Sequence, residues 1–258
     1  VAEKNALLDT GKVEGSQFCF AAGTLVHTKN GLVPIEHINV GDWVLSRHDN
    51  NTGKQAYKRV LKTIQSDETK PIIMLRYYSE LDEKICQLYV TNEHPIFVRS
   101  QSGRDIGWEA AHTIAHPDKL VSFDGTPIEA FEKCTLWVTP NHGVAWGQSR
   151  VHDYGPLVDF NGSAPTILEG RTSEDAMGGM SATFETIVYN LEVEDFHTYY
   201  VGELGIWVHN TSSGSGDVGL INSPSLKQVE AKGQIYSRYG SSNLPHPDTA
   251  PGGPEVPP

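Results

Sequence analysis

The sequence lacks the features that would place it among nucleic-acid-binding or membrane proteins. Its 258 residues contain 20 Lys and Arg against 32 Asp and Glu, which gives a formal charge of −12, and the basic residues form no stripe. Because phosphate binding requires clustered Lys and Arg, we expect no nucleic-acid partner. No apolar run approaches the roughly 20 residues of a membrane-spanning helix, so we expect no membrane partner either.

The beginning of the chain also lacks a targeting signal. Residues 1–5 have neither the basic start nor the apolar core of a signal peptide, and the first residue is not Met. We therefore interpret the sequence as an internal piece of a longer protein. The sequence alone does not indicate in which compartment that protein works.

The sequence contains few cysteines, and their spacing does not suggest disulfide pairs. The three cysteines, Cys19, Cys86 and Cys134, are odd in number and widely spaced, which excludes a disulfide framework. Cys86 and Cys134 lie in stretches rich in β-branched and aromatic residues, where cysteine usually behaves as a small buried hydrophobe. Cys19 differs, because small and flexible residues follow it.

Short β-patterned runs separated by turn residues fill the middle of the chain. They predict an all-β domain over residues 19–210. We expect strands at 24–28, 32–35, 43–46, 57–64, 72–77, 88–91, 94–99, 119–123, 128–138, 184–193 and 205–209. Residues 108–114 are the one short helix candidate, and residues 147–181, rich in Gly, Ser, Pro and Asp, predict a long loop or insertion. After Asn210 the sequence becomes rich in Gly, Ser and Pro, which indicates a flexible flanking segment over residues 211–258.

The start of the β domain offers a nucleophile beside a peptide bond. The thiol of Cys19 can attack the carbonyl of Phe18 and convert the amide into a thioester. This acyl shift needs a distorted amide and a general acid for the leaving nitrogen. His94, in the T-x-x-H motif that begins at Thr91, is our candidate for the acid. The hydroxyl of Thr91 is our candidate donor to the developing oxyanion.

The end of the β domain offers a second self-cleaving group. The side-chain nitrogen of Asn210 can attack its own carbonyl carbon, forming a succinimide and releasing residue 211 as a free amine. An amide nitrogen is a poor nucleophile, so a base and a polarised carbonyl are required. His209 and His197 can supply them, since imidazole titrates in the right range.

Each of these motifs taken alone has a structural explanation. An isolated buried cysteine is usually part of a core, a T-x-x-H and a His-Asn pair occur often by chance, and Asn210 could simply end a strand. The interpretation changes because the three occur in order, at the start, middle and end of one β-rich block, and because the composition shifts at Asn210.

Together these segments resemble the Hint domain, the fold shared by inteins and the autoprocessing part of hedgehog proteins. The resemblance rests on residues 19–26, 35–46, 91–98 and 188–210. It is closest to the bacterial intein-like domains of secreted polymorphic toxins, through Phe196-His197-Thr198-Tyr199-Tyr200-Val201-Gly202 and Trp207-Val208-His209-Asn210.

The resemblance implies a horseshoe-shaped all-β fold that brings both domain ends to one active site and works without a cofactor. It implies an N-terminal flank at residues 1–18, an autoprocessing domain at 19–210 and a C-terminal flank at 211–258. By this similarity Cys19 is the first nucleophile, Thr91 and His94 assist the acyl shift, His197 and His209 assist cyclisation, and Asn210 cyclises. The substrates are the protein's own flanks, between an upstream secreted carrier and a downstream toxin of a bacterial protein.

The sequence departs from the family at one supporting position and leaves one outcome open. Inteins often have Asp where this chain has Asn190, which cannot act as a base, and Asp195 is the nearby carboxylate that could replace it. Thr211 carries the hydroxyl that splicing needs after the Asn, but it is hindered. We therefore expect cleavage at one or both junctions, with splicing as the lesser outcome.

Three other interpretations remain to be weighed. A cysteine peptidase acting on other proteins would pair Cys19 with His94, His142 or His152, but it would leave the terminal His-Asn unexplained. A zinc module is opposed by the lack of C-x-x-C and H-x₃₋₅-H sets other than incidental pairs, although zinc bound by Cys19 and a nearby His could inhibit the reaction. An inactive scaffold that merely presents the tail is the third.

Overall fold

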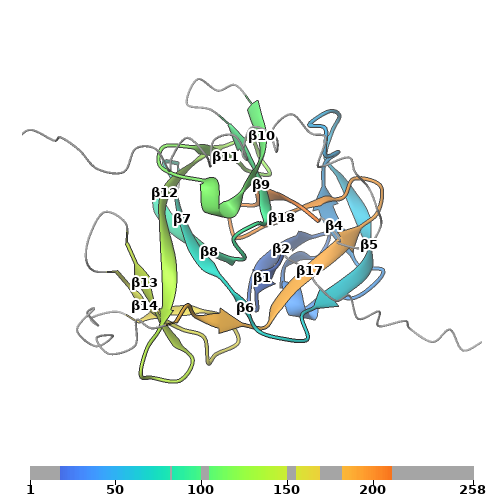
Figure 1. Ribbon diagram of the computed structural model, residues 1–258. Helices are drawn as coiled ribbons and strands as arrows, with labels where there is room; N and C mark the ends of the chain where they lie inside the picture. Colours follow the sequence, from blue (N-terminus) through green and yellow to red (C-terminus); the bar gives the residue numbers. More distant parts are fainter. Residues whose placement is uncertain (1–17, 82, 100–104, 150–154, 169–181, 211–258) are drawn as a thin grey trace, which may run out of the picture.

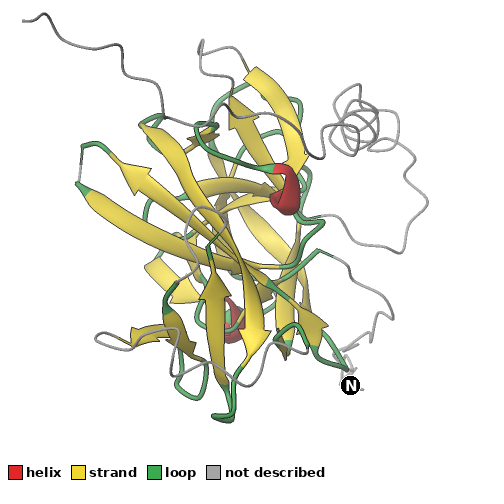
Figure 2. Cartoon of the chain, turned by 60° about the vertical axis from the view of Figure 1, so that its left-hand side comes forward, coloured by secondary structure: helices red, strands yellow, loops and turns green. Residues whose placement is uncertain are grey.

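The protein is almost entirely β-structured. The computed structural model describes residues 18–81, 83–99, 105–149, 155–168 and 182–210. Strands dominate this part of the chain, and its only helical elements are two single turns of 3₁₀ helix, η1 (Ile35–His37) and η2 (Ala111–Thr113) (Figure 2). The prediction of an all-β domain is therefore confirmed. No helix among the described residues is long and apolar enough to cross a membrane.

The strands fall into one large sheet and one small one. The large sheet contains β1 (Phe20–Ala21), β2 (Leu25–Thr28), β3 (Gly31–Pro34), β4 (Trp43–Ser46), β5 (Ala56–Gln65), β7 (Ile73–Ser79), β8 (Lys84–Val90), β9 (Pro95–Arg99), β10 (Asp105–Ala110), β11 (Lys119–Val121), β12 (Pro127–Val138), β13 (Val144–Gln148), β14 (Leu157–Asp159), β15 (Thr166–Leu168), β17 (Val188–Val193), β18 (Thr198–Val201) and β19 (Ile206–His209). The small sheet pairs β6 (Lys70–Pro71) with β16 (Glu185–Thr186).

The pairings of the large sheet run round a closed circuit (Figure 1). Neighbouring strands along the circuit are β1, β8, β7, β12, β11, β9, β19, β18, β2, β4, β5 and β17, and β17 pairs with β1 again. All of these pairings are antiparallel. Closing a sheet on itself removes its exposed edges, and it allows strands from both ends of the chain to be neighbours.

Local sequence explains where strands turn and which side they bury. Lys29 and Asn30 join β2 to β3 as a two-residue hairpin, in which Thr28 is opposite Gly31 and Gly31 has a φ of 102° that favours glycine. Along β5 the burial alternates, so that Val60 and Ile64 point into the core while their neighbours face outward. The main hydrophobic core fills the inside of the circuit, and Phe20, Tyr77 and Tyr199 are among its fully buried members.

Two local predictions were wrong. The helix expected over residues 108–114 is the end of β10 followed by η2, because Trp108, Glu109 and Ala110 pair with β9. The region expected to be a long loop contains β14 and β15, which extend the sheet from β13 outward. Residues 150–154 and 169–181 of that region lie outside the described residues. So do the flanks predicted at 1–18 and 211–258, apart from Phe18.

Candidate active site

Strand pairing brings both ends of the domain to the turn between β8 and β9. Phe20 of β1 is opposite Val90, the last residue of β8, and this pairing places Cys19 beside Thr91. On the other side, Val208 of β19 pairs with Ile96 of β9. The residues predicted at the two ends of the domain therefore meet around the T-x-x-H turn, in which the His94 amide donates to the Thr91 carbonyl (3.2 Å).

The peptide bond between Phe18 and Cys19 is held on its nitrogen side by Thr91. The Cys19 amide donates to the Thr91 hydroxyl (2.9 Å). The same hydroxyl donates to the Cys19 carbonyl (3.2 Å), which also accepts from the Thr91 amide (3.0 Å). The hydroxyl of Thr91 thus bonds the backbone of Cys19 on both sides, and its expected role as a donor to the Phe18 oxygen stays a prediction. In this structure Thr91 holds the leaving nitrogen.

The carbonyl side of that bond is held by Asn190, for which the sequence suggests only a supporting role. The side-chain nitrogen of Asn190, on β17, donates to the Phe18 carbonyl at 2.7 Å. This contact follows from the register of β1 and β17, in which Phe20 is opposite Tyr189. Thr91, in the turn between β8 and β9, and Asn190, on β17, thus hold the N–H and the C=O of one peptide bond.

His94 lies at the same place as a buried, neutral imidazole. Its side chain is fully buried and packs on the ring of Phe20 with centroids 4.1 Å apart. Burial lowers the pKa of His94 to about 3, the charge of His209 lowers it as well, and the nearby backbone of Phe18 opposes the shift. A neutral imidazole at neutral pH can accept a proton before it donates one.

This depressed pKa predicts a loss of stability in acid. The unfolded chain takes up a proton at His94 near pH 6.5, whereas the native protein does so only near pH 3. The free energy of unfolding therefore falls as the pH drops through this window, by about 1.4 kcal/mol per unit at most. Burial also lowers the pKa of His27 and of His209, which adds to the slope.

Replacement of His94 by Gln is expected to make the dependence of unfolding on pH shallower between pH 6 and pH 4. Urea denaturation at several pH values measures this slope for wild type and His94→Gln. The matched control is His112→Gln, which changes a histidine whose side chain is 42% exposed beside Glu93. An equal slope in wild type and His94→Gln would show that the burial of His94 is not the source of acid sensitivity.

Asn210 is buried and anchored through its neighbours. Its side chain is only 3% exposed, and its backbone amide donates to the His197 carbonyl (2.9 Å). With the amide oriented so that nitrogen donates and oxygen accepts, the side chain donates to the same carbonyl (2.5 Å) and accepts from the Val193 amide (2.6 Å). His197 has a φ of 54°, and it contributes its carbonyl here while its imidazole is exposed.

His209 lies beside a carboxylate that the sequence did not single out. Its Nε2 is 3.9 Å from Oδ2 of Asp49, in the loop after β4, and its ring packs edge-on against Trp108 with centroids 5.1 Å apart. The indole nitrogen of Trp108 donates to the Asp49 carbonyl (3.0 Å) and fixes that loop. Burial lowers the pKa of His209, although Asp49 opposes this, so the imidazole is neutral near pH 7.

Two further predictions concern groups near the site. Asp195 does not take the place of an acid at Asn190, because its carboxylate is 62% exposed and binds Lys58 at 2.7 Å. The described residues contain no group of three or more His, Cys, Asp and Glu side chains arranged to hold a metal ion. Inhibition by zinc at Cys19 and a nearby His stays a prediction. Thr211 lies outside the described residues.

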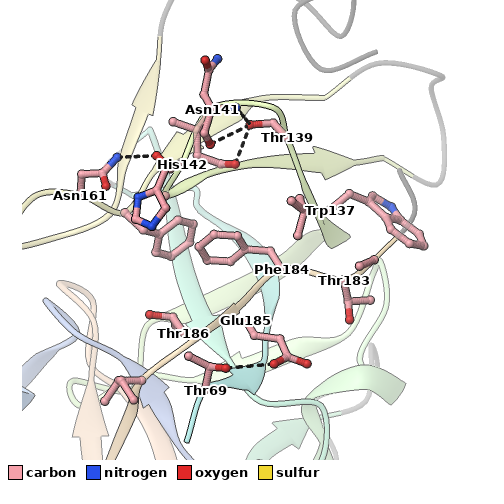
Figure 3. Close-up of a pocket in the computed structure, with 16 residues that line it drawn as sticks. Thr69, Trp137, Thr139, Asn141, His142, Asn161, Thr183, Phe184, Glu185 and Thr186 are labelled. Atoms are coloured by element: carbon pink, nitrogen blue, oxygen red, sulfur yellow. Dashed lines mark hydrogen bonds between the residues drawn. The ribbon is translucent and has the colours of Figure 1, made fainter. Parts of the chain in front are cut away.

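The other candidate nucleophiles and histidines lie elsewhere. Cys86 and Cys134 are buried and form no disulfide, as expected for small core residues, and burial raises the pKa of Cys134 to about 12. His142 and Phe184 line a cleft of about 980 Å³ between the β12–β13 hairpin and β16 (Figure 3). Phe160 also lines it, and its ring packs on that of Phe184 with centroids 4.6 Å apart. Neither Cys19 nor Asn210 lines this cleft. His152 lies outside the described residues.

Comparison with known proteins shows which family has this all-β fold and this T-x-x-H turn. Residues 18–129 match the family model described as the Hint domain, so this chain contains a Hint domain. The match begins at Phe18 and spans the T-x-x-H turn. It does not extend to β13–β15 or to the His-Asn end, which are therefore known here only from the structure.

Several solved structures are similar to the chain. A bacterial intein-like domain from Clostridium thermocellum is 25% identical, with a TM-score of 0.48, over 76% of this chain and all of that one. A DnaB intein from Synechocystis sp. PCC 6803 is 12% identical, with a TM-score of 0.44, over 76% of this chain and 99% of that one. An Msm DnaB1 intein splicing domain bound with zinc is 12% identical, with a TM-score of 0.41, over 74% and 99%. No curated protein sequence matches.

Proposed function

We propose that this Hint domain is a single-turnover self-processing enzyme that cuts its own backbone at Phe18–Cys19 and at Asn210–Thr211. The observation that carries the proposal is that the Phe18–Cys19 peptide bond is itself bound as a substrate. Its carbonyl accepts from Asn190 and its N–H donates to Thr91, beside a neutral, buried His94. Cys19 is fully buried, which favours attack on its own chain over attack on another protein.

The first reaction is an acyl shift that needs no external reactant. The thiol proton of Cys19 passes to neutral His94 as the sulfur adds to the Phe18 carbonyl carbon. The carbon–nitrogen bond then breaks, and His94 returns the proton to the nitrogen of Cys19, leaving a thioester between Phe18 and the Cys19 sulfur. The product is an isomer of the starting chain. Thr91 keeps the leaving nitrogen in the orientation that receives the proton.

The second reaction is the cyclisation of Asn210. Its side-chain nitrogen attacks its own carbonyl carbon, the bond to Thr211 breaks, and the amide proton ends on the Thr211 nitrogen. Acceptance of a hydrogen bond by the His197 carbonyl draws electron density onto the attacking nitrogen and makes it a better nucleophile. Neutral His209, oriented by Asp49, carries the proton between the two nitrogens. The products are a C-terminal succinimide and a free amine.

The flanks of the domain are its substrates in this scheme. A longer secreted parent would place a carrier before Cys19 and a toxin after Asn210, and cleavage after Asn210 would free the toxin. Splicing through the Thr211 hydroxyl is the alternative fate of the thioester. The hindered secondary hydroxyl makes it the slower route, so we propose cleavage as the main outcome.

Intact-mass spectrometry of the freshly expressed chain tests this function. The protein is incubated for hours with and without dithiothreitol. We expect a product ending at Asn210 as succinimide, a fragment of residues 211–258, and a thiol-dependent release of residues 1–18. A joined product of residues 1–18 and 211–258 would instead establish splicing. An unchanged mass under all conditions would contradict self-processing and favour an inactive scaffold.

A further inference from the structure

Asn190 combines deep burial with a direct hydrogen bond to the bond that is to be broken. It is 1% exposed, lies in the middle of β17, and donates from its side-chain nitrogen to the Phe18 carbonyl at 2.7 Å. A buried amide without such partners would be costly, so its position reflects a specific set of contacts. Those contacts fix which end of the amide faces Phe18.

The amide of Asn190 is oriented by two donors on its oxygen. The Tyr199 hydroxyl, from β18, donates to Oδ1 at 2.6 Å, and the Leu191 amide donates to the same oxygen at 2.8 Å. Tyr199 is fully buried, and burial raises its pKa well above the usual value, so the hydroxyl keeps its proton and remains a donor. With the oxygen occupied by donors, only the NH₂ group can point to Phe18.

We infer that Asn190 is the catalytic donor that stabilises the oxyanion on Phe18 during the acyl shift, with Tyr199 as its positioning residue. The inference rests on the proposed self-processing function and deepens its first step. As the Cys19 sulfur adds to the carbonyl carbon, the C=O π electrons move onto the oxygen. The negative charge then develops on the atom to which Asn190 donates.

Asn190 donates directly to the atom that gains this charge. The Thr91 hydroxyl bonds the amide and the carbonyl of Cys19, and Asp195 is ion-paired with Lys58 at the surface. His94 also lies within reach of the Phe18 backbone, where its role is to move the proton. A hydrogen bond that strengthens as charge develops lowers the barrier, and losing one such donor costs roughly 10²–10³ in rate.

The test measures thiol-dependent release of residues 1–18 by intact mass, in an Asn210→Ala background that prevents the second cleavage. We expect Asn190→Ala to slow release by roughly 10²–10³. Asn190→Asp, nearly equal in size, is expected to be slowed as strongly at pH 7.5 and to recover as the pH falls and the acid becomes protonated. The matched control, Asn161→Ala, removes an exposed amide that bonds Asp159 and is expected to react as fast as wild type.

The role of Tyr199 is tested by a double-mutant cycle. Tyr199→Phe removes only the hydroxyl, and we expect a roughly 10-fold slower release with no further loss when it is added to Asn190→Ala. If Tyr199 had only a structural role, the rate losses of Tyr199→Phe and Asn190→Ala would multiply in the double variant. Thermal unfolding of each variant identifies those that fail to fold, and a folded Asn190→Asp variant that reacts at the wild-type rate or faster would overturn the inference.

The outcomes separate this inference from the function on which it rests. If the Asn210→Ala parent releases nothing with thiol, the proposed acyl shift fails. If the parent releases residues 1–18 and a folded Asn190→Ala variant releases them equally fast, the acyl shift holds and the oxyanion role of Asn190 is overturned.

Discussion

Replacement of Cys19 by Ala is expected to abolish thiol-dependent release of residues 1–18. The Phe18 carbonyl would keep its hydrogen bond from Asn190. Residue 19 would keep its contacts with Thr91, because they involve its backbone N–H and C=O and not its side chain. The bound peptide would therefore remain in place without a nucleophile to attack it. A rate indistinguishable from spontaneous amide hydrolysis is the expected result, measured by intact mass over days with dithiothreitol.

Two other variants sharpen this prediction. Cys19→Ser supplies a hydroxyl at the same place, so it is expected to form an ester that hydroxylamine cleaves and dithiothreitol does not. Cys86→Ala is the matched control, because it removes a different buried thiol, in β8, and should leave thiol-dependent release intact. Release of residues 1–18 from Cys19→Ala at the wild-type rate would contradict the thioester mechanism outright.

Residues that act within one short motif could be recognised from the sequence alone. The T-x-x-H spacing indicates a turn that carries a hydroxyl and an imidazole, and the structure closes this turn with a hydrogen bond from His94 to Thr91. The all-β character followed from the short runs between turn residues. These features depend on neighbours in the chain, which is why periodicity and composition reveal them.

Residues that act through strand register could not be recognised in this way. Asn190 and Phe18 are 172 positions apart, and their contact exists only because Phe20 is opposite Tyr189 in the β1–β17 pairing. A shift of one residue would turn the Asn190 side chain to the other face of the strand. Asp49 was missed for a similar reason, since the loop after β4 meets His209 through tertiary packing with Trp108.

The wrong helix prediction has the same origin. Residues 108–114 have an apolar spacing that a helix could use, but Trp108 packs at a right angle on Phe97 of the neighbouring strand β9, with centroids 5.0 Å apart. Pairing with β9 fixes Glu109 and Ala110 in the same sheet. Tertiary pairing thus overrides a weak local preference, and only the last turn, η2, stays helical.

Replacement of Asn210 by Ala is expected to abolish the appearance of the fragment 211–258. The variant lacks the only nitrogen that can close a five-membered ring on this carbonyl, while the backbone amide of residue 210 can still donate to His197. Intact mass over days measures the loss. Asn210→Gln would have to form a six-membered ring from a longer, buried side chain, and it is expected to be strongly slowed. Asn39→Ala, in an exposed turn, is the matched control.

The two ends can then be compared in the same experiment. In a domain that cleaves its ends independently, Asn210→Ala retains thiol-dependent release of residues 1–18, and Cys19→Ala retains release of residues 211–258. The separate contacts of the two sites favour this result, since Asn190 and Thr91 hold the first bond, whereas His197 and Val193 hold Asn210. If Cys19→Ala also stops release of residues 211–258, the second step depends on the first, as it would in splicing. A fragment beginning at Thr211 from Asn210→Ala would contradict cyclisation as its source.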